Sequence, residues 1–254
     1  MAGSLDGSRV ACWFEPGGSG GQPLDAEMLR PRVILFDAES GKPIWEVKDL
    51  RAGGTAGAAL DVSPRGDAVA LVEEQDDLRV LGARGELAWS ARLPRRRGGT
   101  ARDGAGWKVK VASGGTRALA MPVVPARFDS SEGGLDRAVV VARAKGGLTR
   151  IPLGAAASGV SLSPDGAFVA IGTWDDELIL LDRELKELWR KSSPGAPRPI
   201  FTPDGNALLV GTSLGTVAEV GLDGAPRWSI NLTPHGYDAA VVERFRPAKP
   251  KKDR

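Results

Sequence analysis

The side chains that most often carry catalysis are scarce in this sequence. One histidine, His235, and one cysteine, Cys12, occur among 254 residues. Zinc sites and Cys–His nucleophilic pairs draw on several such side chains, so the sequence argues against both. A Ser–His–Asp triad would have to use His235, and no Gly-x-Ser-x-Gly turn accompanies it. We therefore predict no catalytic residue and no cofactor from these residue types.

Carboxylates are the remaining candidates, because paired acids can hydrolyse glycosidic bonds. Asp61 is the one acidic residue that we expect near a central channel, since it lies in an apolar run that starts a predicted sheet. Because Asp61 would be the only carboxylate there, we expect its side chain to be solvated rather than catalytic. The chain also offers only one tyrosine and six phenylalanines as platforms for a sugar. A hydrolase or lyase working in the channel is therefore the alternative function, and a non-catalytic protein is favoured.

Two short acidic stretches could bind a cation. They cover residues 73–77 (EEQDD) and 175–177 (DDE). Neither has the alternating Asp and Asn ligands, the central Gly and the distal Glu of a calcium loop. We interpret both as solvated hairpin tips and predict no metal site.

The densest basic run is RLPRRRGGTAR, at residues 92–102. Its side chains could hold phosphates or an acidic protein partner, or the run could be a solvated loop. The arginines that we expect to contact a partner are Arg95, Arg96, Arg97 and Arg102. The formal charge of the whole chain is only +2, which argues against nucleic acid as the partner.

An internal repeat predicts the elements that position these residues. Residues 162–191 read LSPDGAFVAIGTWDDELILLDRELKELWRK, and the pattern returns at residues 201–232, with Pro164 and Pro203 spaced 39 residues apart. Each copy has a Pro-Asp-Gly turn followed by short apolar runs, which predicts antiparallel strands joined by tight turns. A period of this length with strands alone is typical of β-propeller blades.

Five such units can be traced along the chain. We therefore predict an all-β fold, a five-bladed β-propeller of four-stranded antiparallel blades over residues 1–246, followed by a basic, disordered tail at residues 247–254. Arg150 takes the place of an outer-strand tryptophan in the third unit. In the other four units that tryptophan is Trp45, Trp89, Trp189 and Trp228.

These features resemble the WD-repeat-like and pyrroloquinoline-quinone-like (quinoprotein) β-propeller superfamily. The resemblance rests on the Ser-Pro-Asp-Gly turns, on Gly172-Thr173 and Gly211-Thr212 after a strand, and on the Leu-Trp pairs. In quinoprotein-like blades such a tryptophan docks against the neighbouring blade, so the resemblance implies that role for the four recurring tryptophans. It implies a fold and carries no chemistry with it.

The two ends of the chain are predicted to meet. Residues 5–8 stand where the other units have their Pro-Asp-Gly turn, so the first strand of the first unit is expected to be missing. Residues 237–245 (YDAAVVERF) form another β-rich run. We expect this run to supply the missing strand and to close the ring, which removes two exposed strand edges. The chain as part of a larger propeller is the open alternative.

The connections of the meander predict where a partner would bind. First-to-second and third-to-fourth turns share one rim, and second-to-third turns and blade links share the other, the second rim. The long connections that interrupt the repeat all fall on the second rim, at residues 16–31, 94–106 and 122–136. Recognition usually occurs on such loops, although neutral insertions are the alternative. We expect the arginines above, Trp107 and Phe128 to form the partner-binding surface of a protein-interaction scaffold or complex subunit.

The remaining predictions concern location. No basic segment followed by an apolar run opens the sequence, and no apolar stretch approaches the length of a membrane helix. A single cysteine excludes an internal disulfide and is compatible with a reducing compartment. We expect a bacterial, cytoplasmic protein that does not insert into membranes.

Overall fold

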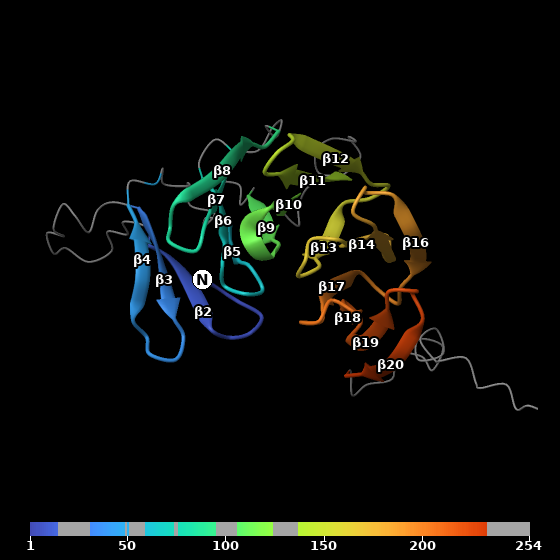
Figure 1. Ribbon diagram of the computed structural model, residues 1–254. Helices are drawn as coiled ribbons and strands as arrows, with labels where there is room; N and C mark the ends of the chain where they lie inside the picture. Colours follow the sequence, from blue (N-terminus) through green and yellow to red (C-terminus); the bar gives the residue numbers. More distant parts are fainter. Residues whose placement is uncertain are drawn as a thin grey trace, which may run out of the picture. The chain divides into compact units, whose positions relative to one another are not determined.

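The computed structural model describes residues 1–14, 31–48, 50, 59–73, 76–94, 106–123 and 137–232. Within these residues the chain forms twenty β-strands and one short 3-10 helix, η3 (Ser113–Gly115). The strands build five four-stranded antiparallel sheets, each following the order of the chain (Figure 1). The predicted all-β class and the five four-stranded units are thereby confirmed. The chain divides into two compact units, Met1–Pro152 and Leu153–Arg254.

The first unit holds three sheets. The first sheet consists of β1 (Ala2–Gly3), β2 (Arg9–Phe14), β3 (Arg32–Asp37) and β4 (Pro43–Val47). The second consists of β5 (Ala59–Val62), β6 (Val69–Val72), β7 (Asp77–Leu81) and β8 (Leu87–Arg92). The third consists of β9 (Trp107–Val111), β10 (Arg117–Pro122), β11 (Ala138–Arg143) and β12 (Leu148–Pro152).

The second unit holds the fourth and fifth sheets. The fourth consists of β13 (Ala157–Leu162), β14 (Val169–Thr173), β15 (Glu177–Leu181) and β16 (Glu187–Ser192). The fifth consists of β17 (Pro197–Phe201), β18 (Ala207–Thr212), β19 (Thr216–Gly221) and β20 (Pro226–Asn231). These are the two copies of the 39-residue repeat.

The first sheet corrects one expectation about the ends of the chain. Its first strand is present as β1, in which Ala2 pairs with Ala11 and Gly3 pairs with Val10. The sequence hid this strand because two small residues do not form a recognisable apolar run. The β-rich run at residues 237–245 lies outside the described residues, so ring closure through it stays a prediction.

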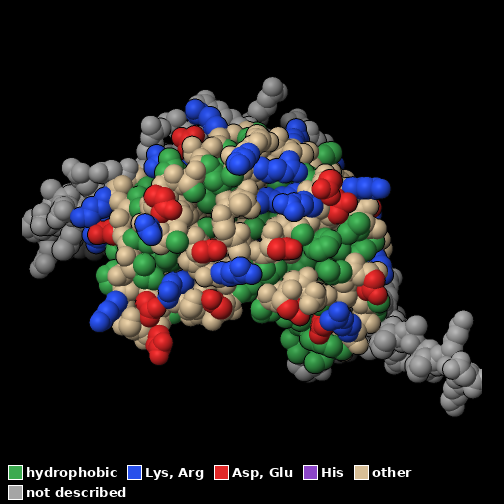
Figure 2. All heavy atoms as spheres, in the orientation of Figure 1, with side chains coloured by type: hydrophobic (Ala, Val, Ile, Leu, Met, Phe, Trp, Pro, Cys, Tyr) green, Lys and Arg blue, Asp and Glu red, His purple; other side chains and the backbone are tan. Residues whose placement is uncertain are grey.

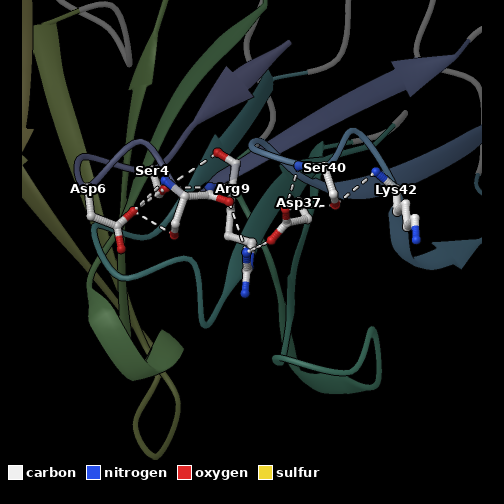
Figure 3. A network of polar contacts seen from close by, with 7 residues as sticks. Ser4, Asp6, Arg9, Asp37, Ser40 and Lys42 are labelled. Carbon is white, nitrogen blue, oxygen red and sulfur yellow. Dashed lines mark hydrogen bonds and ion pairs between the residues drawn. The ribbon is translucent and has the colours of Figure 1, made fainter.

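A hydroxyl side chain organises the turn between the first and second strands. In the fourth sheet, Ser163 Oγ accepts a hydrogen bond from Phe168 N at 2.8 Å. In the first sheet, Ser4 Oγ accepts one from Arg9 N at 3.0 Å (Figure 3). Gly166 follows in the left-handed region, with φ of 73°, which only glycine adopts without a Cβ penalty. The Ser-Pro-Asp-Gly pattern therefore specifies one type of turn.

The same rim of the first sheet is tied together by charge. Arg9 Nη1 forms an ion pair with Asp37, which also accepts a hydrogen bond from Ser40 N at 2.9 Å (Figure 3). Hydrogen bonds from Ser4 and Ser8 lower the pKa of Asp6 from 3.8 to about 2. Both carboxylates are thus used to hold turns in place.

Sheets of one unit pack face to face through aliphatic side chains. Inner strands such as β6 and β10 are buried at every residue, whereas β8 and β12 are exposed or half-buried throughout. The core between the fourth and fifth sheets contains Ala170, Leu178, Leu180, Phe201, Leu208, Val210, Ala218 and Val220. Two-sided burial explains why the inner strands read as continuous apolar runs.

Candidate interaction surface

Asp61, the one candidate for channel chemistry, lies on β5 and is buried. Its Oδ2 accepts a hydrogen bond from Val111 N at 2.9 Å, and its Oδ1 lies 2.7 Å from Lys110 Nζ. Both partners belong to β9, the first strand of the next sheet. Burial raises the pKa of Asp61, although Lys110 and the Val111 N–H favour its ionised form. The carboxylate therefore connects two first strands.

The second unit makes the same connection without a charge. Ser161 of β13 occupies the position two residues before the turn, as Asp61 does in β5. Its Oγ accepts a hydrogen bond from Phe201 N of β17 at 3.1 Å. Because a neutral hydroxyl serves equally, the position requires a hydrogen-bond acceptor rather than an acid. This equivalence favours a structural role for Asp61.

Three of the four recurring tryptophans, Trp45, Trp89 and Trp189, lie against the next sheet of their unit. Trp189 Nε1 donates a hydrogen bond to Leu222 O at 2.7 Å, and its ring lies beside Gly224. Trp45 contacts Gly85 in the same way, because a Cβ on that glycine would come within 3.0 Å of the ring. A glycine in the third-to-fourth turn thus makes room for an indole from the preceding sheet.

The third sheet differs from its sequence-based interpretation. Trp89 donates a hydrogen bond from Nε1 to Gly115 O of this sheet. In each sheet, the residue two positions before the first turn can be followed to its paired residue on the second, third and fourth strands. In the second sheet this row ends at Trp89. In the third sheet it ends at Thr149. Arg150 lies on the opposite face, so Thr149 takes the tryptophan position. Loop lengths in the third unit concealed this one-residue offset.

Most of the predicted binding residues lie outside the described residues. These are Arg95, Arg96, Arg97, Arg102 and Phe128. Trp107 is described: it starts β9, is buried in the core between the second and third sheets, and donates a hydrogen bond from Nε1 to Asp76 Oδ1 at 2.7 Å. Its ring therefore presents little area to a partner and anchors the start of its strand.

The acidic turn of the second sheet is more structured than a solvated tip. Glu73 is buried, and its carboxylate pairs with Arg79 at 3.2 Å. Asp76 adopts a left-handed conformation, with φ of 67°, and its carbonyl oxygen accepts a hydrogen bond from Leu93 N at 2.8 Å. For these two acids the solvated interpretation is wrong, because the chain leaving β8 folds back onto the turn.

The equivalent turn of the fourth sheet exposes a tryptophan. Trp174 lies between β14 and β15 and is 53% exposed, whereas its backbone N–H is bonded to Ala156 O at 2.9 Å. Asp176 is left-handed, and its carbonyl oxygen accepts from Ser193 N at 2.7 Å. The turn joins the second and third strands of its sheet, the class of connection predicted to lie on the second rim. In the sequence Trp174 stands directly before the acidic stretch at residues 175–177, and this position in a polar turn was the signal that could have identified it.

Other kinds of site find no support in the part of the chain that the structure describes. No three His, Cys, Asp or Glu side chains gather there as metal ligands would. No helix among the described residues has the length and apolar character needed to cross a membrane. Comparison with protein-family models and with curated proteins finds no match to this chain.

Proposed function

We propose that this protein is a non-catalytic interaction scaffold or assembly subunit that binds a protein partner through connections of the second rim. The observation that carries the proposal is the exposed indole of Trp174 on a turn whose backbone is fixed by hydrogen bonds. Tryptophan buries a large area at low entropic cost and is enriched among the residues that dominate binding energy. An ordered turn keeps the cost of binding small.

Basic loops of the same topological class supply the second part of the proposal. Arg95, Arg96, Arg97 and Arg102 follow the second sheet, and Phe128 lies in the insertion of the third. Positive charge on such loops would steer an acidic partner and set specificity more than affinity. Closure of the five sheets into one ring, and a cytoplasmic location in a bacterium, remain part of this proposal.

The enzymatic alternative needs a second carboxylate near Asp61. Among the described residues, Asp61 contacts the amine of Lys110 and the N–H of Val111 instead. Ser161 makes the equivalent contact in the second unit. These contacts support the scaffold over a hydrolase or lyase.

A matched pair of variants tests the proposal. Trp174→Ala removes the exposed ring, and Leu188→Ala removes a similarly exposed apolar side chain from β16. We expect the tagged protein to capture a stoichiometric partner from its native lysate. Trp174→Ala should weaken that capture on the order of tenfold or more, with the melting temperature unchanged. Equal capture by wild type and both variants would exclude this turn from the interface.

A further inference from the structure

Two of the turns between second and third strands have the same backbone. Asp76 in the second sheet and Asp176 in the fourth are both left-handed, with φ of 67° and 61°. The carbonyl oxygen of each accepts a hydrogen bond from the first residue after the fourth strand, from Leu93 N at 2.8 Å and from Ser193 N at 2.7 Å. The two aspartate side chains therefore leave equivalent backbone positions, and the groups that each one meets can be compared directly.

In the second sheet a tryptophan occupies this turn. Trp107 Nε1 donates a hydrogen bond to Asp76 Oδ1 at 2.7 Å, and only 8% of Trp107 is exposed. Because Trp107 is the first residue of β9, it reaches the turn from the next sheet. An indole supplies a donor for the carboxylate together with a ring that buries a large area. The chain itself thus shows which side chain fits a turn of this shape.

In the fourth sheet the equivalent carboxylate lacks such a donor. The register of the two strand pairs makes Pro197, the first residue of β17, the counterpart of Trp107. A proline side chain has no hydrogen-bond donor. Asp176 is exposed, and among the residues that the structure describes its carboxylate accepts no hydrogen bond and forms no ion pair. The acceptor that Trp107 satisfies in the second sheet is therefore open in the fourth.

The residue that bonds to the turn also differs between the two sheets. Leu93 is 1% exposed and apolar, whereas Ser193 is 2% exposed and carries a hydroxyl group. Ser193 Oγ is buried and finds no hydrogen-bond partner within the described ranges. Buried hydroxyl groups are normally paired, because an unpaired one costs free energy. A buried, unpaired hydroxyl on the residue that bonds to Asp176 indicates a polar group that the described residues do not supply.

The turn of the fourth sheet adds an aromatic ring to these polar atoms. Trp174 stands two residues before Asp176 and is 53% exposed. Aromatic rings favour edge-to-face pairs, because the edge of a ring is positive and its face is negative. Hydrophobic and acidic side chains lie next to each other at several places over the second unit (Figure 2), so this combination alone does not distinguish the turn. The difference from the second sheet does.

We propose that the turn of Trp174 and Asp176 binds a tryptophan side chain of the protein partner. The bound indole donates its N–H to the carboxylate of Asp176, as Trp107 does to Asp76, and its ring packs against Trp174. This inference rests on the proposed function and adds the chemical class of the bound residue. Arginine also combines a flat surface with N–H donors, and it is the alternative occupant that the test distinguishes.

Two short peptides test the proposal on the full chain. The first is acetylated and amidated Gly-Trp-Lys-Val, which copies residues 106–109. The second carries a methyl group on the indole nitrogen, which removes the donor and retains the ring. In NMR titrations of the isotope-labelled chain, we expect the first peptide to shift the signals of the Trp174 indole and of the Asp176 amide. The methylated peptide should bind about three- to tenfold more weakly.

Variants at Asp176 connect this preference to the carboxylate. Asp176→Gly removes the acceptor and tolerates the left-handed backbone, as Gly215 does at this position of the fifth sheet. It should bind both peptides equally, and as weakly as wild type binds the methylated one. Asp176→Asn keeps an oxygen acceptor and should retain the preference for the unmethylated peptide. The amide spectrum of each variant shows whether its sheets are folded.

Several outcomes would overturn the proposal. These are a wild-type chain whose turn signals do not shift, equal binding of the two peptides by wild type, and tighter binding of Gly-Arg-Lys-Val than of the tryptophan peptide. Partner capture with Trp174→Ala is measured separately. Reduced capture with equal peptide binding would keep this turn in the interface and reject tryptophan as its ligand. Undiminished capture with a clear peptide preference would instead reject the role of the turn in partner binding.

Discussion

At the scale of single residues, Asp61 shows how the repeat decides between two interpretations of a carboxylate. Its pKa is raised by burial, as a general acid would require, yet its oxygens are used by Lys110 and by the backbone of Val111. Ser161 in the second unit shows that the position requires only an acceptor. The sequence places Asp61 on a first strand, but no local pattern indicates that its hydrogen-bond partner is Val111, 50 residues away.

Asp61→Ser and Asp61→Leu should therefore differ in stability. The serine keeps an acceptor for Val111 N and should change the free energy of unfolding by less than about 1 kcal/mol, whereas leucine leaves that N–H unpaired and should cost about 1–3 kcal/mol. Denaturant unfolding at neutral pH measures both. Equal losses for the two variants would mean that the carboxylate has a role beyond accepting this hydrogen bond.

The raised pKa of Asp61 adds a dependence on pH to the same comparison. A folded-state pKa above the unfolded value means that the native protein binds more protons, so stability falls as pH rises from 3.8 through the raised pKa. Asp61→Ser lacks this titration. The free energy of unfolding of Asp61→Ser relative to wild type should therefore increase as pH rises from 3.8 through the raised pKa and stay constant above it.

At the scale of elements, a turn and an indole together hold one sheet to the next. The Pro-Asp-Gly turns were predictable because their geometry is set by residues within a few positions of each other. The tryptophan column was predictable from its period, except in the third sheet, where Thr149 replaces the expected Arg150 through a one-residue offset. The strand β1 was not predictable, because its stability comes from pairing with β2 rather than from its own two residues.

Two tryptophans with different surroundings test this docking. Trp189→Phe removes the hydrogen bond to Leu222 O at a contact between sheets, and should cost about 1 kcal/mol in addition to the lost ring area. Trp228→Phe removes only a solvent-exposed hydrogen bond to the half-buried Glu219, and should cost less than about 0.5 kcal/mol. Thermal and denaturant unfolding give both values. A larger loss for Trp228→Phe would contradict the assignment of Trp189 as the docking residue.

At the scale of the whole molecule, the sequence predicted the fold class and the number of sheets, because both follow from a repeat that every unit carries. It could not predict which connection exposes an aromatic side chain. Trp107 was expected on the surface but is buried against the second sheet, and Trp174 is exposed on a turn that resembles its neighbours. Exposure depends on what the adjoining segments cover, and no local pattern records that.

The scaffold function is tested most directly by partner capture with a variant in which the charge of the basic run at residues 92–102 is reversed. Arg95, Arg96 and Arg97 are changed together to Glu, and the variant is compared with wild type for partner recovered per mole of bait. We expect a stoichiometric partner with wild type, a reduction on the order of tenfold or more in the variant, and an unchanged melting temperature. Undiminished recovery would place the interface away from the basic loop. Recovery of no partner by wild type would contradict the scaffold function and favour the alternative, a hydrolase or lyase working in the central channel.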